Sequence, residues 1–427
     1  MNMIEQGRSF VEWLETLKQR STWEWRRCPD CGGRETYKNG SYVRRPWTFA
    51  GRKSLRVQRH WCVRCRKSYS EQVAWLAARK WYGREVQRYA IDQWQHMGSS
   101  LRRTAEGVRS WIGRQERWLI WRPWETAEGE RCHLVASTVH RWLDGAGRKA
   151  QEQSKGAWEG LPSSGHLGVD GLWVRLREGS KRAVLLVVDS VSGLLYPPLV
   201  AAEEESAAGW GALFERAKAA GLDLQTIRGL TSDGAHGLMA YLEQSLRGVN
   251  QQRCVWHVWR NLGRPLGKVV AQAVKGLAKE VAQPVREQLR AGLETLIQAV
   301  LDAPTYLQAE QELAHLMAHP SGGALGKMLN ELLDRLFVYL LSEQQGLLRV
   351  TPEWVWRDFR LRLSHGRNHG SEQRLERAAL LWAIYHNFTP AQWRSERKRH
   401  YRHPGQSALQ LSGASPGPIS YLDALAV

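Results

Sequence analysis

Two apolar segments of this chain each bring an aspartate to a position in or just after a buried strand. Residues 167–176 read LGVDGLWVRL, with Asp170 in the middle, and residues 226–230 lead to Asp233. A carboxylate within an apolar sheet is costly unless a partner offsets its charge. A divalent cation is such a partner, and Mg²⁺ prefers oxygen ligands. The pattern therefore predicts that Asp170 and Asp233 are metal ligands in an α/β domain.

Other apolar runs complete this predicted domain. Their composition and length predict three successive strands, a helix and a fourth strand, at residues 167–176, 182–189, 194–201, 206–220 and 226–230. This is the order of elements in the RNase H-like fold. Asp189 is the alternative to Asp170 as the first metal ligand, but Ser-Val-Ser-Gly follows it, and an aspartate in that setting more often caps a turn.

Two Cys-x-x-Cys pairs lie near the start of the chain. They comprise Cys28 with Cys31 and Cys62 with Cys65. Two residues between thiolates allow one tight turn to direct both sulfurs at one ion, and two such turns complete a four-sulfur zinc site. The residues between the pairs predict a β-hairpin or meander, with turns at 39–40 and 50–51. We predict a structural zinc ribbon, with a redox pair or unrelated thiols as the alternatives.

The charge of the chain favours a polyanionic partner. Lysine and arginine number 61 against 42 acidic residues, which gives a formal charge of +19, and nucleic acid is the first expectation for such an excess. Basic residues between the cysteine pairs are candidates for phosphate contact, among them Arg44, Arg45, Arg52 and Lys53. No apolar run approaches the ~20 residues of a membrane span, and the N-terminus lacks the layout of a signal peptide. We therefore expect a cytosolic protein without a membrane partner.

A helical region follows the cysteine pairs. Residues 98–105 are typical of the first helix of a helix-turn-helix, and residues 135–143 resemble its recognition helix. The candidates for DNA contact on the second helix are Ser137, Thr138, His140 and Arg141. A basic, tryptophan-rich insertion at 110–133 separates the two helices. Cys132 within it is expected to be a small buried residue rather than a ligand.

The ordered set of motifs resembles the Mutator-like superfamily of DDE transposases, which includes bacterial insertion-sequence enzymes. The motifs are Asp170 in GVDGLWV, Asp233 in LTSDGAHGL, and Cys254-Val255-Trp256-His257 shortly afterwards. The resemblance covers residues 167–401 and implies an RNase H-like catalytic domain with a long helical insertion and a final glutamate. The amphipathic helices expected at 268–342, with a break at Pro284, are consistent with that insertion.

The resemblance also suggests which residue is the last acid. Glu372 follows a polar, Asn-containing loop and precedes an apolar helix, where the family has its glutamate; Glu376, one helical turn later, is the runner-up. Cys254 and His257 are expected to border the active site on a helix, where His257 would bond a phosphate or a catalytic carboxylate. A zinc half-site, or a core cysteine with a buried histidine, are the alternatives for that pair.

These features together predict a DDE transposase. It would bind the terminal inverted repeats of an element, and cleave and join DNA with two Mg²⁺ or Mn²⁺ ions and one structural Zn²⁺. We expect a homodimer acting on double-stranded DNA, both repeats and target, in a bacterial cytoplasm in association with the nucleoid. A catalytically silent DNA-binding regulator derived from a transposase, or a metal-dependent nuclease of the same fold, are the alternatives.

The expected domains follow the same order along the chain. They are a zinc ribbon at 1–80, a helix-turn-helix-like region at 81–150, a linker at 151–164, the first part of the RNase H-like core at 165–262, a helical insertion at 263–360, the last helix of the core at 361–403 and a flexible tail at 404–427. A basic run within 391–403 is expected to follow the DNA backbone.

Overall fold

The computed structural model describes most of the chain, in two compact units that comprise residues 1–145 with 427 and residues 146–426. The described residues are 27–73, 75–77, 80–112, 132–152, 158–201, 205–344, 346–350, 353–365, 369–390, 405–414, 420–425 and 427. Most of the insertion expected at 110–133, part of the expected linker and the basic run within 391–403 lie outside these residues. None of the described helices combines the length and apolar composition that a membrane crossing requires.

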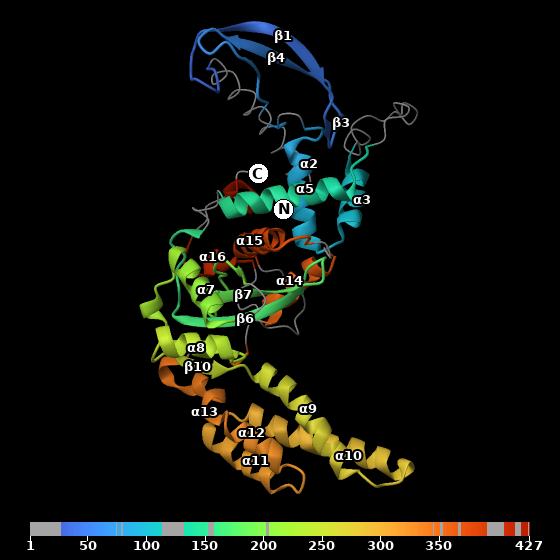
Figure 1. Ribbon diagram of the computed structural model, residues 1–427, viewed down its shortest axis with the longest axis vertical. Helices are drawn as coiled ribbons and strands as arrows, with labels where there is room; N and C mark the ends of the chain where they lie inside the picture. Colours follow the sequence, from blue (N-terminus) through green and yellow to red (C-terminus); the bar gives the residue numbers. More distant parts are fainter. Residues whose placement is uncertain are drawn as a thin grey trace. The chain divides into compact units, whose positions relative to one another are not determined.

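Among the described residues, the first unit contains a small antiparallel sheet of order β1-β4-β5, a short hairpin and three helices (Figure 1). Its elements are β1 Thr36–Arg44, β2 Trp47–Thr48, β3 Gly51–Arg52, β4 Leu55–Cys62, β5 Ser68–Ser70, α2 Arg84–Met97, α3 Leu101–Trp111 and α5 Ala136–Glu152, which continues into the second unit. The structure confirms the strands that were predicted between the cysteine pairs.

The turn expected at Asn39-Gly40 is instead a bulge within β1. Gly40 has a φ of 75°, and the pairing with β4 shifts between Lys38 and Ser41.

The second unit is built on a five-stranded sheet of order β10-β9-β6-β7-β8. Its strands are β6 His166–Arg175, β7 Lys181–Asp189, β8 Leu199–Ala201, β9 Gly229–Ser232 and β10 Asn250–Arg253. β7 is antiparallel to both of its neighbours, whereas β6, β9 and β10 are mutually parallel. Residues 183–188 of β7 are fully buried, as expected for a central strand with both faces covered.

The other described helices of this unit, apart from those between β10 and residue 337, are α7 Ala207–Ala219, α8 His236–Ser245, α14 Glu353–His365, α15 Glu372–Phe388, α16 Ala408–Leu411 and α17 Tyr421–Ala424. α7 packs against β7 and β8. α15 packs against β7 and β8. At its end, the Asn387 side chain accepts a hydrogen bond from the Leu195 amide and donates one to the Leu195 carbonyl, both at 2.8 Å. The Asn387 amide group therefore pairs with the backbone as a neighbouring strand would.

Two predicted strand boundaries were wrong. The strand expected at 194–201 shortens to β8, because Pro197 and Pro198 lack the amide hydrogens that ladder pairing needs. The strand expected at 226–230 begins at Gly229 and ends at Ser232, directly before Asp233, since a short 3₁₀ turn at Leu224–Thr226 precedes it.

A separate group of helices follows β10 in the chain and packs around its own apolar core (Figure 1). Its members are α9 Val255–Ala273, α10 Lys279–Asp302, α11 Tyr306–Ala318, α12 Gly323–Asn330 and α13 Leu333–Leu336. The break expected at Pro284 was wrong, because α10 runs through this residue. A proline so near the start of a helix removes one backbone hydrogen bond, and the chain breaks instead at residues 274–278.

A buried carboxyl at the start of α2 makes the first unit sensitive to pH. Glu85 folds back over Gly83, where an added Cβ would lie 2.3 Å from Oε1, and both of its carboxylate oxygens are buried. Burial raises the pKa of Glu85 from 4.5 to about 7. The folded unit therefore holds a proton that the unfolded chain releases, and the stability of the unit falls as the pH rises from 4.5 through 7.

We predict that Glu85→Gln, which mimics the protonated carboxyl, stabilises the first unit by about 2 kcal/mol at pH 8 and by much less at pH 4. Hydrogen exchange of the α2 amides in the full chain measures this difference. Glu106→Gln on α3 serves as the control, and it should lower stability by at most about 0.5 kcal/mol at either pH, because it removes only an exposed ion pair with Arg102. Equal stabilisation by Glu85→Gln at both pH values would contradict the prediction.

Candidate functional site

The parallel pairing of β6 with β9 brings Asp170 and Asp233 to the same level of the sheet. Gly168 pairs with Thr231. Asp170 and Asp233 each lie two residues after these partners, and the strands run in the same direction, so the two aspartates lie side by side. Asp170 is 4% exposed, and its Oδ1 accepts a hydrogen bond from the Gly171 amide at 2.9 Å. Asp233 follows the end of β9 and its Oδ1 accepts from the Ala235 amide at 2.9 Å, which starts the turn into α8.

The first turn of α9 adds a histidine to this pair. The amide of Cys254, the residue that caps α9, donates to the Ser232 carbonyl at 2.8 Å and so fixes the start of the helix to the end of β9. One ligand atom each of His257, Asp170 and Asp233 lie within 4.8 Å of one another. In the described part of the chain, Cys254 is not in this group; its side chain is fully buried.

The side chains of this group are of the types that bind metal cations. Two carboxylates supply the oxygen ligands that Mg²⁺ and Mn²⁺ prefer, and a neutral imidazole is a ligand for transition metals. Asp170 and His257 are buried, and the cost of burying a carboxylate falls when a positive charge lies beside it. The alternative ligand Asp189 serves as a turn cap, as predicted: its Oδ1 accepts from the amides of Val191 and Ser192.

A further acid that sequence reasoning missed lies beside this group. Glu205 precedes α7, and an added Cβ on Gly171 would lie 2.6 Å from its Oε1. Burial raises the pKa of Glu205, the charge of Asp233 raises it further, and a hydrogen bond with Trp173 opposes both effects. The available signal was an acidic run directly before the predicted helix, although nothing local distinguishes its last member.

The two glutamates expected to be the last acid pair elsewhere. Glu372 at the start of α15 accepts from Arg182 Nε at 2.8 Å, and Glu376 accepts from Arg216 at 2.7 Å. Neither belongs to a ligand group with Asp170 among the described residues. Arg182 pairs with Val174 of β6, and Val174 is four residues after Asp170 on the same strand. Side chains an even number of residues apart point to the same face of a sheet, so Arg182 and Asp170 share a face. Four residues separate them along that face, roughly 13 Å.

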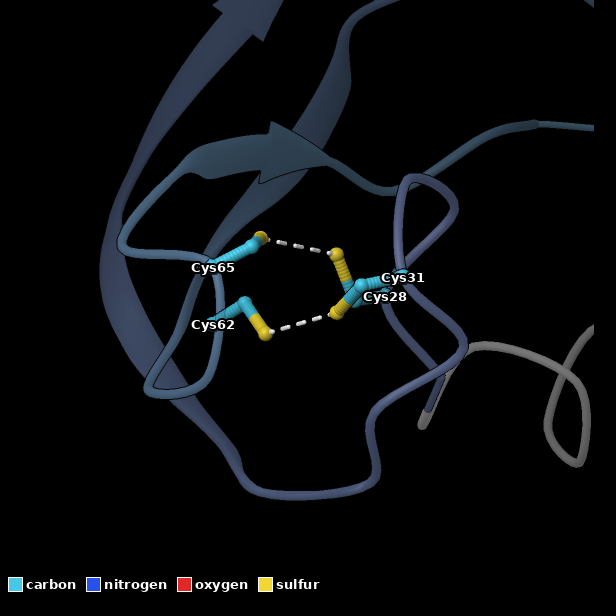
Figure 2. Close-up of side chains that lie close together, drawn as sticks. All are labelled: Cys28, Cys31, Cys62 and Cys65. Atoms are coloured by element: carbon cyan, nitrogen blue, oxygen red, sulfur yellow. Dashed lines mark hydrogen bonds between the residues drawn. The ribbon is translucent and has the colours of Figure 1, made fainter.

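The four N-terminal cysteines come together in the first unit (Figure 2). Their sulfur atoms all lie within 4.8 Å of one another, with 3.5 Å between Cys28 and Cys65 and 3.6 Å between Cys31 and Cys62. These separations far exceed a disulfide bond. They are near the sulfur spacing of about 3.8 Å in a tetrahedral zinc site. The cluster is therefore compatible with zinc.

The basic residues expected to contact DNA differ in their surroundings. Arg44 donates to the carbonyls of Ala77 and Lys80, and Arg52 donates to the Arg45 carbonyl and lies over the Trp47 ring. These two side chains therefore also brace the local backbone. The other two candidates of the ribbon, Arg45 and Lys53, are exposed.

On α5 the candidates follow a helical pattern. Ser137 and Arg141 are exposed, and Thr138 and His140 are partly buried. Arg141 donates to the Ser137 carbonyl and to the Thr138 hydroxyl, which orders the exposed face. Val139 and Trp142 are buried on the opposite side, as predicted, while Leu143 is only partly buried. In the same unit Cys132, which was expected to be buried, is partly buried, and burial raises the pKa of its thiol.

Comparison with known proteins identifies the central part of the chain. No curated protein matches it. Residues 198–316 match the family described as "Transposase, Mutator family". This segment includes Asp233, Cys254 and His257, begins after Asp170 and ends before Glu372. This match supports a Mutator-like transposase, and it covers only the central part of the chain.

Proposed function

We propose that this chain is a DDE transposase that binds the inverted repeats at the ends of an element and catalyses Mg²⁺-dependent DNA cleavage and strand transfer. One observation carries the proposal: the carboxylates of Asp170 and Asp233 meet across the β6–β9 pairing, in a chain that matches a transposase family. The strand order, with the first strand central and two parallel strands on one side of it, supports an RNase H-like core.

Asp170 and Asp233 would hold two Mg²⁺ or Mn²⁺ ions, with His257 beside them. The fit rests on two oxygen donors and one nitrogen donor within 4.8 Å. When bound, such ions lower the pKa of a water molecule or a 3′-hydroxyl and offset the charge on the leaving oxygen. The protein's own contribution is to hold the two carboxylates on hydrogen-bonded strands, so little reorganisation accompanies the reaction.

Glu372 is the proposed third acid, on the ground of its resemblance to the family's last glutamate. In the structure its carboxylate pairs with Arg182 and is about half exposed. A catalytic role for it requires that the start of α15 moves towards Asp170 when DNA binds. Glu205 is the alternative third acid, because it already lies beside Asp233 and Gly171.

DNA binding is assigned to the first unit. The cysteine cluster would hold one structural Zn²⁺ and order the ribbon that carries Arg45 and Lys53, and the exposed face of α5 would supply Ser137 and Arg141. The net charge of +19 supports a nucleic-acid partner. A transposase must process both ends of the transposable element together. We therefore propose a homodimer that binds the two terminal repeats and the target DNA.

We predict that Asp170→Asn and Asp233→Asn each lower Mg²⁺-dependent cleavage of an end-containing duplex by roughly 10³-fold, without loss of DNA binding. Electron paramagnetic resonance should show weaker Mn²⁺ binding in both variants. Asp223→Asn is the matched control, because Asp223 is an exposed aspartate of the same unit, at the start of a 3₁₀ turn that it caps.

Product analysis separates the proposal from its rivals. Cut but never joined DNA would point to a nuclease. If wild type is as inert as Asp233→Asn while both bind DNA, the chain is a regulator and the enzymatic proposal fails.

For the third acid, we predict that Glu372→Gln abolishes cleavage, whereas Glu376→Gln retains it. Glu376→Gln should cost only about 1 kcal/mol of stability, because it removes one ion pair with Arg216. Urea unfolding and cleavage are measured on the same samples. If Glu205→Gln abolishes cleavage and Glu372→Gln does not, the third acid is Glu205.

For the cysteine cluster, we predict one zinc per chain by metal analysis of the purified protein. Cys62→Ser should lose the metal and weaken binding of the repeat sequence, because the ribbon loses its cross-link. Cys254→Ser, a buried cysteine outside the cluster, is the control that keeps the zinc. Purified wild type without stoichiometric zinc would refute this assignment.

A further inference from the structure

An arginine side chain lies against the loop that holds Asp233. Arg253 is the last residue of β10 and pairs in register with Ser232 of β9. An added Cβ on Gly234 would lie 0.9 Å from Arg253 Nη1, so the guanidinium rests directly on the Gly234 backbone. Gly234 has a φ of +72°, a conformation that side chains disfavour. The glycine that follows Asp233 thus makes room for the Arg253 guanidinium.

The charge of Arg253 is only partly balanced. Within the ranges that the structure describes, its buried Nε has no hydrogen-bond partner and no carboxylate forms an ion pair with it. Burial lowers the pKa of Arg253, the charge of Asp233 raises it, and the charge of Arg335 lowers it. Arg335 belongs to α13, which packs against β10. Two guanidinium groups therefore lie near one another at the edge of the Asp170–Asp233 group.

We propose that Arg253, with Arg335 beside it, binds the phosphate of the DNA strand that reacts at Asp170 and Asp233. A guanidinium presents its N–H groups in a planar fork that matches two phosphate oxygens. A phosphate bound between the Arg253 and Arg335 guanidinium groups would balance their positive charge and would accept hydrogen bonds from their N–H groups. The proposal rests on the proposed function, because it takes the reacting phosphate as the ligand.

This contact has a chemical role. The non-bridging oxygens of the phosphate gain negative charge during strand cleavage, and a fixed cation that faces them stabilises that charge. The Gly234 backbone holds the guanidinium in position before DNA binds. The contact carries no sequence information, because phosphates are common to every DNA sequence.

The first measurement does not depend on activity. Binding of a duplex of arbitrary sequence is measured over a range of salt concentrations for wild type, Arg253→Gln and Arg247→Gln. Loss of one phosphate contact should lower the slope of log K against log[salt] by about 0.9 for Arg253→Gln. Arg247 is exposed, follows the C-terminal end of α8 and donates to the Glu243 carbonyl, with no other bond to the residues that the structure describes. Arg247→Gln should therefore keep the wild-type slope.

The second measurement is single-turnover cleavage of an end-containing duplex. Arg253→Gln should cleave about 10²-fold more slowly, and Arg253→Lys, which keeps the charge but not the fork, should recover part of that loss. A purely structural role predicts the opposite pattern, with both variants losing melting temperature and neither changing the salt slope.

The two measurements separate the possible failures. If wild type cleaves and Arg253→Gln cleaves equally well with an unchanged salt slope, the phosphate contact is refuted while the proposed function stands. If wild type does not cleave, the proposed function fails and the salt slope alone decides: a reduced slope supports Arg253 as a phosphate contact, and an unchanged slope refutes it.

Discussion

The pairing of β6 with β9 is the interaction on which the candidate site depends. Parallel strands cannot be joined by a short turn, so the chain passes through β7, β8 and α7 before it returns as β9 beside β6. The register is decisive as well, because a slip by one residue would turn Asp233 to the other side of the sheet. The buried β7 and the packing of α15 on β7 and β8 hold the sheet in the arrangement that keeps this register.

The site also reflects a balance of charge in a restricted space. Asp170, Asp233 and Glu205 gather near one another, and their mutual repulsion favours a cation between them. Arg253 lies against Gly234, next to Asp233, and the charge of Arg335 repels it. A cation among the carboxylates and an anion at the guanidinium groups would complement both sets of charges, as a DNA phosphate with its metal ions does.

Much of the sheet could be predicted from the sequence, because β6 and β7 are long apolar runs with a single acid in each. β10 could not, since its sequence NQQR carries no apolar alternation; it forms because Gln252 bonds the Leu336 carbonyl and the Tyr339 amide from within the core. The sequence also predicted that His257 borders the site on a helix, and it lies near both aspartates. The Cys254–Ser232 hydrogen bond that joins this helix to β9 could not be predicted, because it links backbone groups of two separate elements. The ion pair of Glu372 with Arg182 joins distant segments, which local patterns cannot reveal.

The helix α9 determines how far the helical group is an independent part of the molecule. Its first turn carries His257 beside the aspartates, while Val258, Leu262, Leu266 and Val270 of the same helix belong to the core of the helical group. One continuous element thus serves two cores. The helical group therefore cannot be deleted as a whole without effect on the site. A shortened protein must keep the first turns of α9 and end that helix with a new C-cap, because otherwise His257 is deleted together with the helices.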